Sequence, residues 1–193
     1  MNRLSKPFIL MIVAAILNGC AAAIVGGTAI NAAHDRRTMG SFVEDQNIEL
    51  KAYDAIEKEE HDNKETQISV TSYNGIVLLS GQTTDPNMKT RTEALVSKIE
   101  KVRKVHNEIK IAKPVTMSEA ASDTWITTKV KTSLLKVEGH EGFDPTRIKV
   151  VTDNGTVYLM GLLRRAEADD AINVVRKVKG VERVVKIFEY INE

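Results

Sequence analysis

The chain repeats itself at a spacing of 80 residues. Residues 68–81, ISVTSYNGIVLLSG, align without a gap with residues 148–161, IKVVTDNGTVYLMG. Identical residues occupy seven of these positions: Ile68 and Ile148, Val70 and Val150, Asn74 and Asn154, Gly75 and Gly155, Val77 and Val157, Leu79 and Leu159, and Gly81 and Gly161. Self-similarity at a fixed offset is the signature of a repeated supersecondary unit. The chain is therefore predicted to fold as two copies of one domain.

Each repeated segment predicts a β-hairpin. An Asn-Gly pair stands at its centre, and both residue types tolerate the positive φ angles that a two-residue type I′ turn requires. Apolar residues alternate on either side of the pair, as they do in half-buried strands. Across such a turn Val70 faces Leu79 and Ser72 faces Val77, so the turn and the alternation agree on one largely apolar face.

A helix is predicted before each hairpin and another after it. Apolar or small residues follow the i, i+4, i+7, i+8 spacing of one buried helix face, and Asp45 and Asp123 stand where N-caps belong. The buried positions are Ile48, Ala52, Ala55 and Ile56 in the first copy and Ile126, Val130, Ser133 and Leu134 in the second. The second helices are predicted at about 87–101 and 165–179, and closing strands at 105–111 and 184–191.

The predicted fold class is therefore α+β, with two tandem α-β-β-α-β domains. In each domain two helices pack on a three-stranded mixed sheet, because this is the smallest arrangement that covers every amphipathic element. The predicted boundaries are 45–112 for the first domain, 113–122 for a linker that contains Pro114, and 123–193 for the second domain. Units of this size are marginally stable alone, so the two are expected to pack together.

The N-terminus predicts export. Arg3 and Lys6 precede ten apolar residues, Phe8 to Leu17, which is about half the length that crosses a bilayer. Residues 1–19 are therefore interpreted as a signal peptide. Cys20 directly follows and is the single cysteine of the chain, which excludes an internal disulfide. A free or buried cysteine after an ordinary signal is the alternative interpretation.

The segment from Leu17 to Cys20, LNGC, resembles the lipobox of bacterial lipoproteins, although Asn18 departs from the usual small residue. This resemblance implies cleavage before Cys20, which would then carry a diacylglycerol thioether and an N-acyl chain such as palmitate. Residues 20–44 would form a lipidated tether. Ala21, not Asp, follows the cysteine, and the resemblance then implies the periplasmic face of the outer membrane.

The composition gives little support to catalysis or nucleic-acid binding. The net charge is +1, from 27 basic and 26 acidic residues, so no global basic field exists to bind phosphates of nucleic acid. The four histidines, His34, His61, His106 and His140, are not at metal-ligand spacing, and no nucleophile elbow or glycine-rich phosphate loop is present. No catalytic residue, metal or cofactor is predicted.

Three segments carry a resemblance to a family. They are DTWITTKV at 123–130, NGTVYLMGL at 154–162 and VERVV at 181–185. With the repeat and the lipobox, the chain resembles the dual BON-domain lipoproteins of the Gram-negative outer membrane. This resemblance implies a non-catalytic protein that binds anionic phospholipid through its second domain and supports membrane integrity. It also implies links to cell division and to the outer-membrane protein assembly machinery. Lys101 departs from the pattern where the second copy has Gly180.

One flank of the helix that begins the second copy is the predicted phospholipid site. Its residues are Trp125, Thr128, Lys129, Lys131, Thr132, Leu135 and Lys136. Residues 123–136 sum to +2 (three lysines, one aspartate), whereas residues 45–58 sum to −2 (two lysines, four acids). Tryptophan and lysine suit the interface of an anionic bilayer. The alternative is that Trp125 packs against the linker or the first domain.

The sheet face of the second copy that points away from its helices is predicted to contact the first domain. Its residues are Val151, Tyr158, Met160, Val185 and Ile187, an apolar set where the first copy is mostly polar. A sheet that is simply richer in β-branched residues is the alternative. Two functions stay open: a monomeric lipid-binding module, and a lipidated protein-interaction adaptor or chaperone of the assembly machinery.

Overall fold

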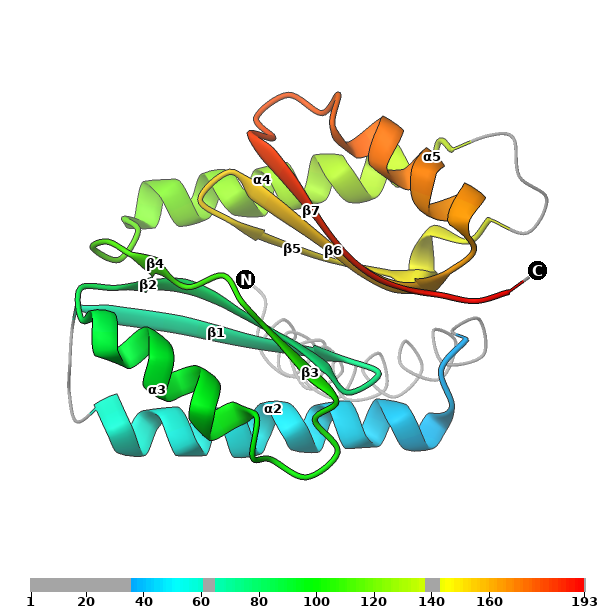
Figure 1. Cartoon of the computed structure of the whole chain (residues 1–193). Coiled ribbons are helices and arrows are strands. Elements are labelled where there is room, and N and C mark those ends of the chain that lie inside the picture. The colour runs from blue at the N-terminus through cyan, green and yellow to red at the C-terminus, as the bar shows by residue number, and fades with distance from the viewer. Residues whose placement is uncertain (1–35, 61–64, 138–142, 193) are drawn as a thin grey trace, which may run out of the picture. The chain divides into compact units, whose positions relative to one another are not determined.

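A computed structural model describes residues 36–60, 65–137 and 143–192, and residues 36–193 form one compact unit (Figure 1). The predicted signal peptide, the acylation site at Cys20 and residues 20–35 of the predicted tether lie outside the described residues. The tether prediction is wrong at its end, because residues from Met39 onward are helical.

The first domain has two helices and a mixed sheet. The helix α2 (Met39–Glu60) leads to an antiparallel pair, β1 (Thr66–Tyr73) and β2 (Ile76–Thr83). After α3 (Pro86–Val96), the chain returns to pair with β2 in parallel as β3 (Lys104–Asn107) and β4 (Lys110–Ile111). The closing strand is therefore one path along β2, interrupted at residues 108–109.

The second domain repeats this order without the interruption. It consists of α4 (Met117–Leu134), a short 3₁₀ turn (Pro145–Arg147), β5 (Ile148–Asp153), β6 (Thr156–Leu163), α5 (Arg165–Val175) and β7 (Arg183–Tyr190). The strands β5 and β6 are antiparallel, and β6 and β7 are parallel. The predicted fold class of two tandem α-β-β-α-β domains is confirmed.

Both hairpins turn at their Asn-Gly pairs. Asn74 and Gly75 have φ angles of 53° and 73°, and Asn154 and Gly155 have 45° and 70°, which is the left-handed backbone that a type I′ turn requires. Val70 pairs with Leu79 and Ser72 with Val77, so the predicted register is confirmed. The turn chemistry and the strand alternation are sufficient to set this register because both act locally.

The predicted N-caps are wrong. Both first helices begin about six residues earlier than Asp45 and Asp123, and α4 is capped by Thr116, whose hydroxyl forms a capping box with Glu119. Six of the ten residues of the predicted linker, 117–122, are therefore helical. The two aspartates lie inside their helices, and their carboxylates accept hydrogen bonds from the hairpin turns. The second helices are also shorter than predicted, since α3 and α5 end at Val96 and Val175.

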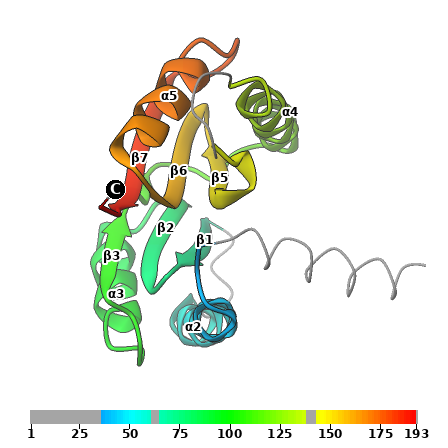
Figure 2. The same ribbon diagram turned by 90° about the vertical axis from the view of Figure 1, so that its right-hand side faces the viewer.

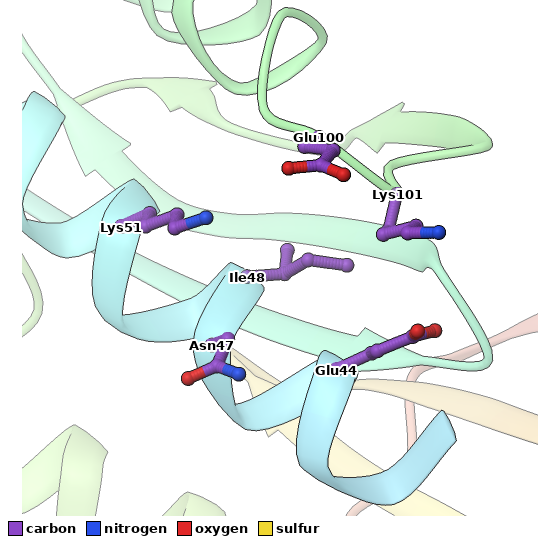
Figure 3. A pocket seen from close by; sticks show the side chains of 6 residues that line it. All are labelled: Glu44, Asn47, Ile48, Lys51, Glu100 and Lys101. Atoms are coloured by element: carbon purple, nitrogen blue, oxygen red, sulfur yellow. The ribbon is translucent and has the colours of Figure 1, made fainter. Parts of the chain in front are cut away.

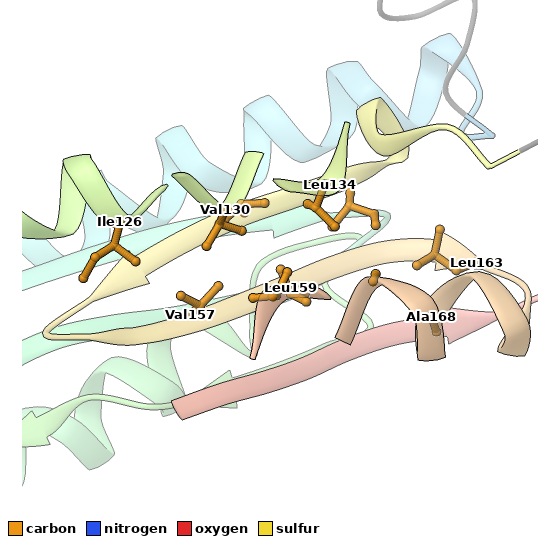
Figure 4. Packing of buried hydrophobic residues seen from close by; sticks show 11 residues of the cluster. Ile126, Val130, Leu134, Val157, Leu159, Leu163 and Ala168 are labelled. Atoms are coloured by element: carbon orange, nitrogen blue, oxygen red, sulfur yellow. The ribbon is translucent and has the colours of Figure 1, made fainter. Parts of the chain in front are cut away.

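Each domain has its own hydrophobic core between helices and sheet. In the second domain Ile126, Val130 and Leu134 of α4 pack against Val157 and Leu159 of β6 (Figure 4). In the first domain the corresponding residues of α2 are Ile48, Ala52 and Ile56. The helical spacing therefore identified the buried faces correctly, although Ala55 and Ser133 are only half-buried.

A third cluster joins the two sheets on the faces that the helices leave free. Tyr73 and Leu78 of the first domain pack there with Tyr158, Met160 and Ile187 of the second. The layers are therefore helices, sheet, sheet, helices, and the outer faces of α2 and α4 point away from each other (Figure 2). We call the contact between the sheets the interdomain seam.

Candidate functional site: the outer face of α4

The outer face of α4 exposes large apolar side chains. Ile126, Val130 and Leu134 cover the sheet, so residues on the opposite side of the helix face outward. Trp125 is 65% exposed and Leu135, at the C-cap, is 71% exposed. Trp125 therefore does not pack into the linker or the first domain, and the alternative interpretation of this residue is wrong.

The threonines of this face bind their own helix. The hydroxyl groups of Thr124, Thr128 and Thr132 donate to the carbonyl oxygens of the residues four positions earlier, at 3.0, 3.0 and 2.8 Å. Burying a hydroxyl that has no hydrogen-bond partner is costly. Because these hydroxyls already have partners, the face can leave water with little loss of hydrogen bonding.

The lysines of the predicted site are not equivalent. Lys131 and Lys136 are exposed, whereas Lys129 is half-buried and its Nζ donates to the backbone carbonyl of Lys179 in the turn after α5. Lys129 therefore holds the turn against α4. Its charge sits at the edge of the face and not at the centre.

Two groups of residues extend the face beyond the predicted set. Met117, which is 92% exposed, and Ala121 lie on the same side of α4 as Trp125, in the part of the helix that was predicted to be linker. The turn after α5 adds Arg176, Lys177 and Lys179, all exposed, beside Lys129. Comparison of the repeats could have found the second group, because the first copy has Ser97, Lys98 and Glu100 at these positions.

The structure brings the five predicted interdomain residues to the seam. Tyr158, Met160 and Ile187 are buried in the cluster that contains Tyr73 and Leu78, and Val151 and Val185 pack partly buried around it. Polar contacts frame the cluster. They include the ion pairs Lys149–Glu49, Arg103–Glu189 and Arg183–Glu108, each at 2.9 Å, and a buried hydrogen bond of 2.7 Å from Gln82 Nε2 to Asp153 Oδ1.

Two consecutive arginines before α2 bind one domain each. The guanidinium of Arg36 makes two hydrogen bonds, of 2.6 and 2.8 Å, to the buried carboxylate of Glu167 in α5. Arg37 donates to Asp45 at 2.8 Å and lies 3.8 Å from the centre of the Tyr73 ring. The start of the folded unit is therefore tied to both domains.

These contacts set the ionisation of Glu167. Burial raises the pKa of this carboxyl, but hydrogen bonds from Arg36 and from the backbone N–H of Arg164 outweigh burial, and the pKa lies below its usual value. The pKa of Arg36 is raised by the same hydrogen bond. The pair is charged at neutral pH and serves as a structural ion pair.

The buried, titratable side chain of Tyr158 lies at the interdomain seam. Burial raises the pKa of Tyr158 to about 12, with the nearby carboxylates of Glu108 and Asp153 adding to the effect, so its hydroxyl stays protonated at neutral pH. No group of three or more His, Cys, Asp or Glu side chains within residues 36–60, 65–137 and 143–192 could hold a metal ion. None of the helices in this part of the chain has the length and hydropathy of a membrane span.

A small pocket lies beside α2 in the first domain. It has a volume of about 180 Å³, with Ile48 at its centre and Glu44, Asn47, Lys51, Glu100 and Lys101 around it (Figure 3). In the second domain Lys129, the counterpart of Lys51, crosses the corresponding gap to the carbonyl of Lys179. The pocket therefore marks a difference between the two copies.

Comparison with known proteins identifies both domains. The pattern of the BON domain matches residues 44–113 and 122–192. The chain is 34% identical over 194 aligned positions to the outer membrane lipoprotein DolP of Haemophilus influenzae, covering 100% of this chain and 99% of that protein. It is 34% identical to the 21 kDa hemolysin of Actinobacillus pleuropneumoniae, covering 81% and 79% of the two chains.

The osmotically-inducible protein Y of Escherichia coli is 30% identical, with 76% of this chain and 72% of that protein covered. None of these three relatives is named for an enzymatic activity. The full-length match to DolP includes the N-terminal residues as well as both domains. The chain belongs to the BON-domain family and is a dual BON-domain protein of the DolP type.

Proposed function

We propose that this protein is a non-catalytic lipoprotein, anchored through Cys20 to the periplasmic face of the outer membrane, that binds anionic phospholipid through the outer face of α4. The observation that carries the proposal is the exposed Trp125 on a helix face with Leu135, Lys131 and Lys136. The family of the chain and the name of its relative DolP support the location.

The physical chemistry of the face suits a bilayer surface. An indole prefers the headgroup level, and the apolar side chains of Met117 and Leu135 can enter the acyl boundary. Each basic residue near an anionic surface contributes about 1 kcal/mol. The exposed basic residues here are Lys131, Lys136, Arg176, Lys177 and Lys179, so the electrostatic part is strong at low salt and screened at high salt.

Vesicle flotation tests the proposal. Acyl-free protein beginning at Ala21 contains the whole described fold and should float with phosphatidylglycerol vesicles, whereas the Trp125→Glu variant should not. The melting temperature should be nearly unchanged, because Trp125 is exposed. Asn47→Glu is the matched control, since Asn47 occupies the position of Trp125 in the first copy.

Two results would contradict the proposal. Acyl-free wild-type protein that does not float with anionic vesicles would favour the alternative function, a lipidated adaptor that depends on its acyl chains. Unchanged flotation of both Trp125→Glu and Leu135→Glu would show that another surface binds lipid. If Trp125→Glu unfolds, the result for Leu135→Glu decides, because this residue lies at the end of the helix.

Charge-reversal variants test the electrostatic contribution to vesicle binding. Changing Lys131 and Lys136 together to Glu should weaken vesicle binding, and the loss should be larger at low salt than at high salt. Lys129→Glu should also weaken binding. It should destabilise the domain as well, because Lys129 binds the carbonyl of Lys179. Equal binding by the double variant and the wild type at low salt would contradict the role of these charges.

A further inference from the structure

The outer face of α2 carries a second exposed apolar stripe. Met39, Val43 and Leu50 are all exposed, Leu50 to 66%, and at 100° per residue they lie within about 40° of one another around the helix. Tyr53 flanks them. The opposite side of the helix, with Ile48, Ala52 and Ile56, is the buried one. The stripe therefore belongs to the surface, not to the core.

The charge around this stripe is opposite to that around α4. The exposed charged residues of the whole helix are Glu44, Asp54, Glu57 and Glu59 against Lys51 and Lys58, which gives −2. Of these, Asp54 and Glu57 lie beside the stripe, within about 60° of Met39 around the helix. An anionic bilayer repels such a surface. A partner for α2 must instead combine an apolar stripe with positive charge.

The protein itself carries a surface of that description. The outer face of α4 has Met117, Trp125 and Leu135 along its length, with lysines beside them. The two helices have 22 and 18 residues, so they are about 33 and 27 Å long and offer stripes of similar length. Within one molecule these faces cannot meet, because both helices lie outside the two sheets that pack on each other.

We propose that the outer face of α2 docks onto the outer face of α4 of a second copy of this chain. Anionic lipid competes with this contact because it uses the same face of α4. The proposal therefore rests on the apolar and basic character of α4, as the proposed function does. The contact joins two different surfaces, so a pair of molecules keeps one free α2 face and one free α4 face, and association is head to tail and open-ended.

The expected affinity is low. A single pair of helix faces buries less than the roughly 800 Å² per partner of a standard protein interface. Acylated molecules confined to one membrane surface meet at a raised effective concentration, which favours weak contacts. The association should accordingly be visible in solution only at high protein concentration and low salt.

Mixing two variants tests the proposal. In sedimentation velocity, acyl-free wild-type protein from Ala21 should show a sedimentation coefficient that rises with concentration and falls when salt is added. Leu50→Lys disrupts the α2 face and Trp125→Glu disrupts the α4 face, so each variant alone should sediment as a monomer. An equimolar mixture should form pairs and nothing larger. The α2 face of Trp125→Glu can dock onto the α4 face of Leu50→Lys, and the other two faces of the pair are disrupted.

The controls separate this contact from lipid binding. Thr90→Lys makes the same neutral-to-lysine change at an exposed position of α3 and should associate like the wild type. Leu50→Lys should still float with phosphatidylglycerol vesicles, because its α4 face is intact. Each disrupting variant should raise the apparent dissociation constant at least about tenfold, equivalent to about 1.4 kcal/mol.

Three results would overturn the proposal. They are a wild-type protein that stays monomeric at all concentrations in low salt, a variant mixture that stays monomeric, and association of Leu50→Lys alone. Leu135→Glu replaces Trp125→Glu if the latter unfolds. None of these results depends on vesicle binding, so failure of the α2 contact and failure of the lipid proposal are distinguishable.

Discussion

At the scale of single residues, one carboxylate in each domain ties the first helix to the hairpin turn. Asp45 accepts hydrogen bonds from the backbone N–H groups of Asn74 and Gly75, from the Ser72 hydroxyl and from Arg37, at 2.6 to 2.8 Å. Among the residues that the structure describes, Asp123 accepts from the two turn N–H groups alone, at 2.7 and 3.0 Å. The first domain therefore depends more on its aspartate.

We predict that Asp45→Ala costs about 3–5 kcal/mol, since it removes a buried carboxylate that pairs with Arg37 and accepts from the Ser72 hydroxyl and two backbone N–H groups. Asp123→Ala should cost about 1–3 kcal/mol, because it removes a partner from two N–H groups. Urea unfolding monitored by circular dichroism measures both. The exposed Asp54→Ala change on α2 is the control and should stay within about 0.5 kcal/mol. Equal losses for Asp45→Ala and Asp123→Ala would contradict this ranking.

The ion pair of Glu167 predicts a pH dependence of stability. The pKa of Glu167 is lower in the folded protein than its usual value of 4.5, so its contribution is present above that value and is lost as the pH falls through the folded pKa. The free energy of unfolding of the wild type should fall more steeply below about pH 4.5 than that of Glu167→Gln. Urea unfolding at several pH values checks this, with the exposed Glu59→Gln as control. Parallel pH curves for wild type and Glu167→Gln would exclude the contribution.

At the scale of elements, the two copies form the same turn with different residues. The turn after the second helix of each domain contains a residue with positive φ, which is Lys101 at 72° in the first copy and Gly180 at 102° in the second. A side chain costs about 1–2 kcal/mol in the left-handed region, whereas glycine adopts it freely. A Cβ atom on Gly180 would also lie 3.1 Å from Cγ1 of Ile126.

Substitutions at this turn should therefore have opposite signs. We expect Lys101→Gly to stabilise the protein by about 0.5–1 kcal/mol, because the lost strain exceeds the added entropy of the unfolded glycine. Gly180→Ala should destabilise it by about 1–2 kcal/mol. Thermal unfolding of the two variants measures both, and each serves as the control for the other. Destabilisation by Lys101→Gly would show that the lysine side chain, not the backbone, matters at this position.

At the scale of the whole molecule, the interdomain seam joins two small domains into one compact unit. The buried apolar cluster of Tyr73, Leu78, Tyr158, Met160 and Ile187 is a core shared by both sheets, and three ion pairs surround it. Domains of about 70 residues bury too little surface to be robust alone. The shared core therefore adds stability that neither domain has by itself.

We predict that Leu78→Asp uncouples the domains. Leu78 is fully buried in the seam, so a charge there should open the contact while the two separate cores persist. The wild type should unfold in one transition and the variant in two, and NMR relaxation should show slower tumbling for the coupled wild type. Ile111→Asp, at a half-exposed position of β4, is the control. The isolated second domain, residues 113–193, should also be less soluble than the pair. Fast, independent tumbling of the two domains in the wild type would contradict the coupling.

Features that depend on near neighbours along the chain could be predicted from the sequence. The two hairpins, their register and the buried faces of α2 and α4 follow from the φ preference of Asn-Gly and from periods of two and 3.6 residues, which are local properties. The repeat also revealed the different surfaces of the two first helices, because the same fold carries both. Trp125 and Leu135 were identified in this way.

Contacts between groups that lie far apart in the sequence could be identified only in the folded chain. Asp45 and Asp123 look like N-caps in sequence, yet their partners are turns about 30 residues further along the chain. Lys129 looks like a lipid contact, yet it binds a carbonyl 50 residues away and brings a basic turn to α4. Arg36 belongs to the segment that the sequence predicts to be a tether, yet it binds buried Glu167. Such contacts depend on the packing geometry between elements, and this geometry cannot be predicted from the spacing of residues along the chain.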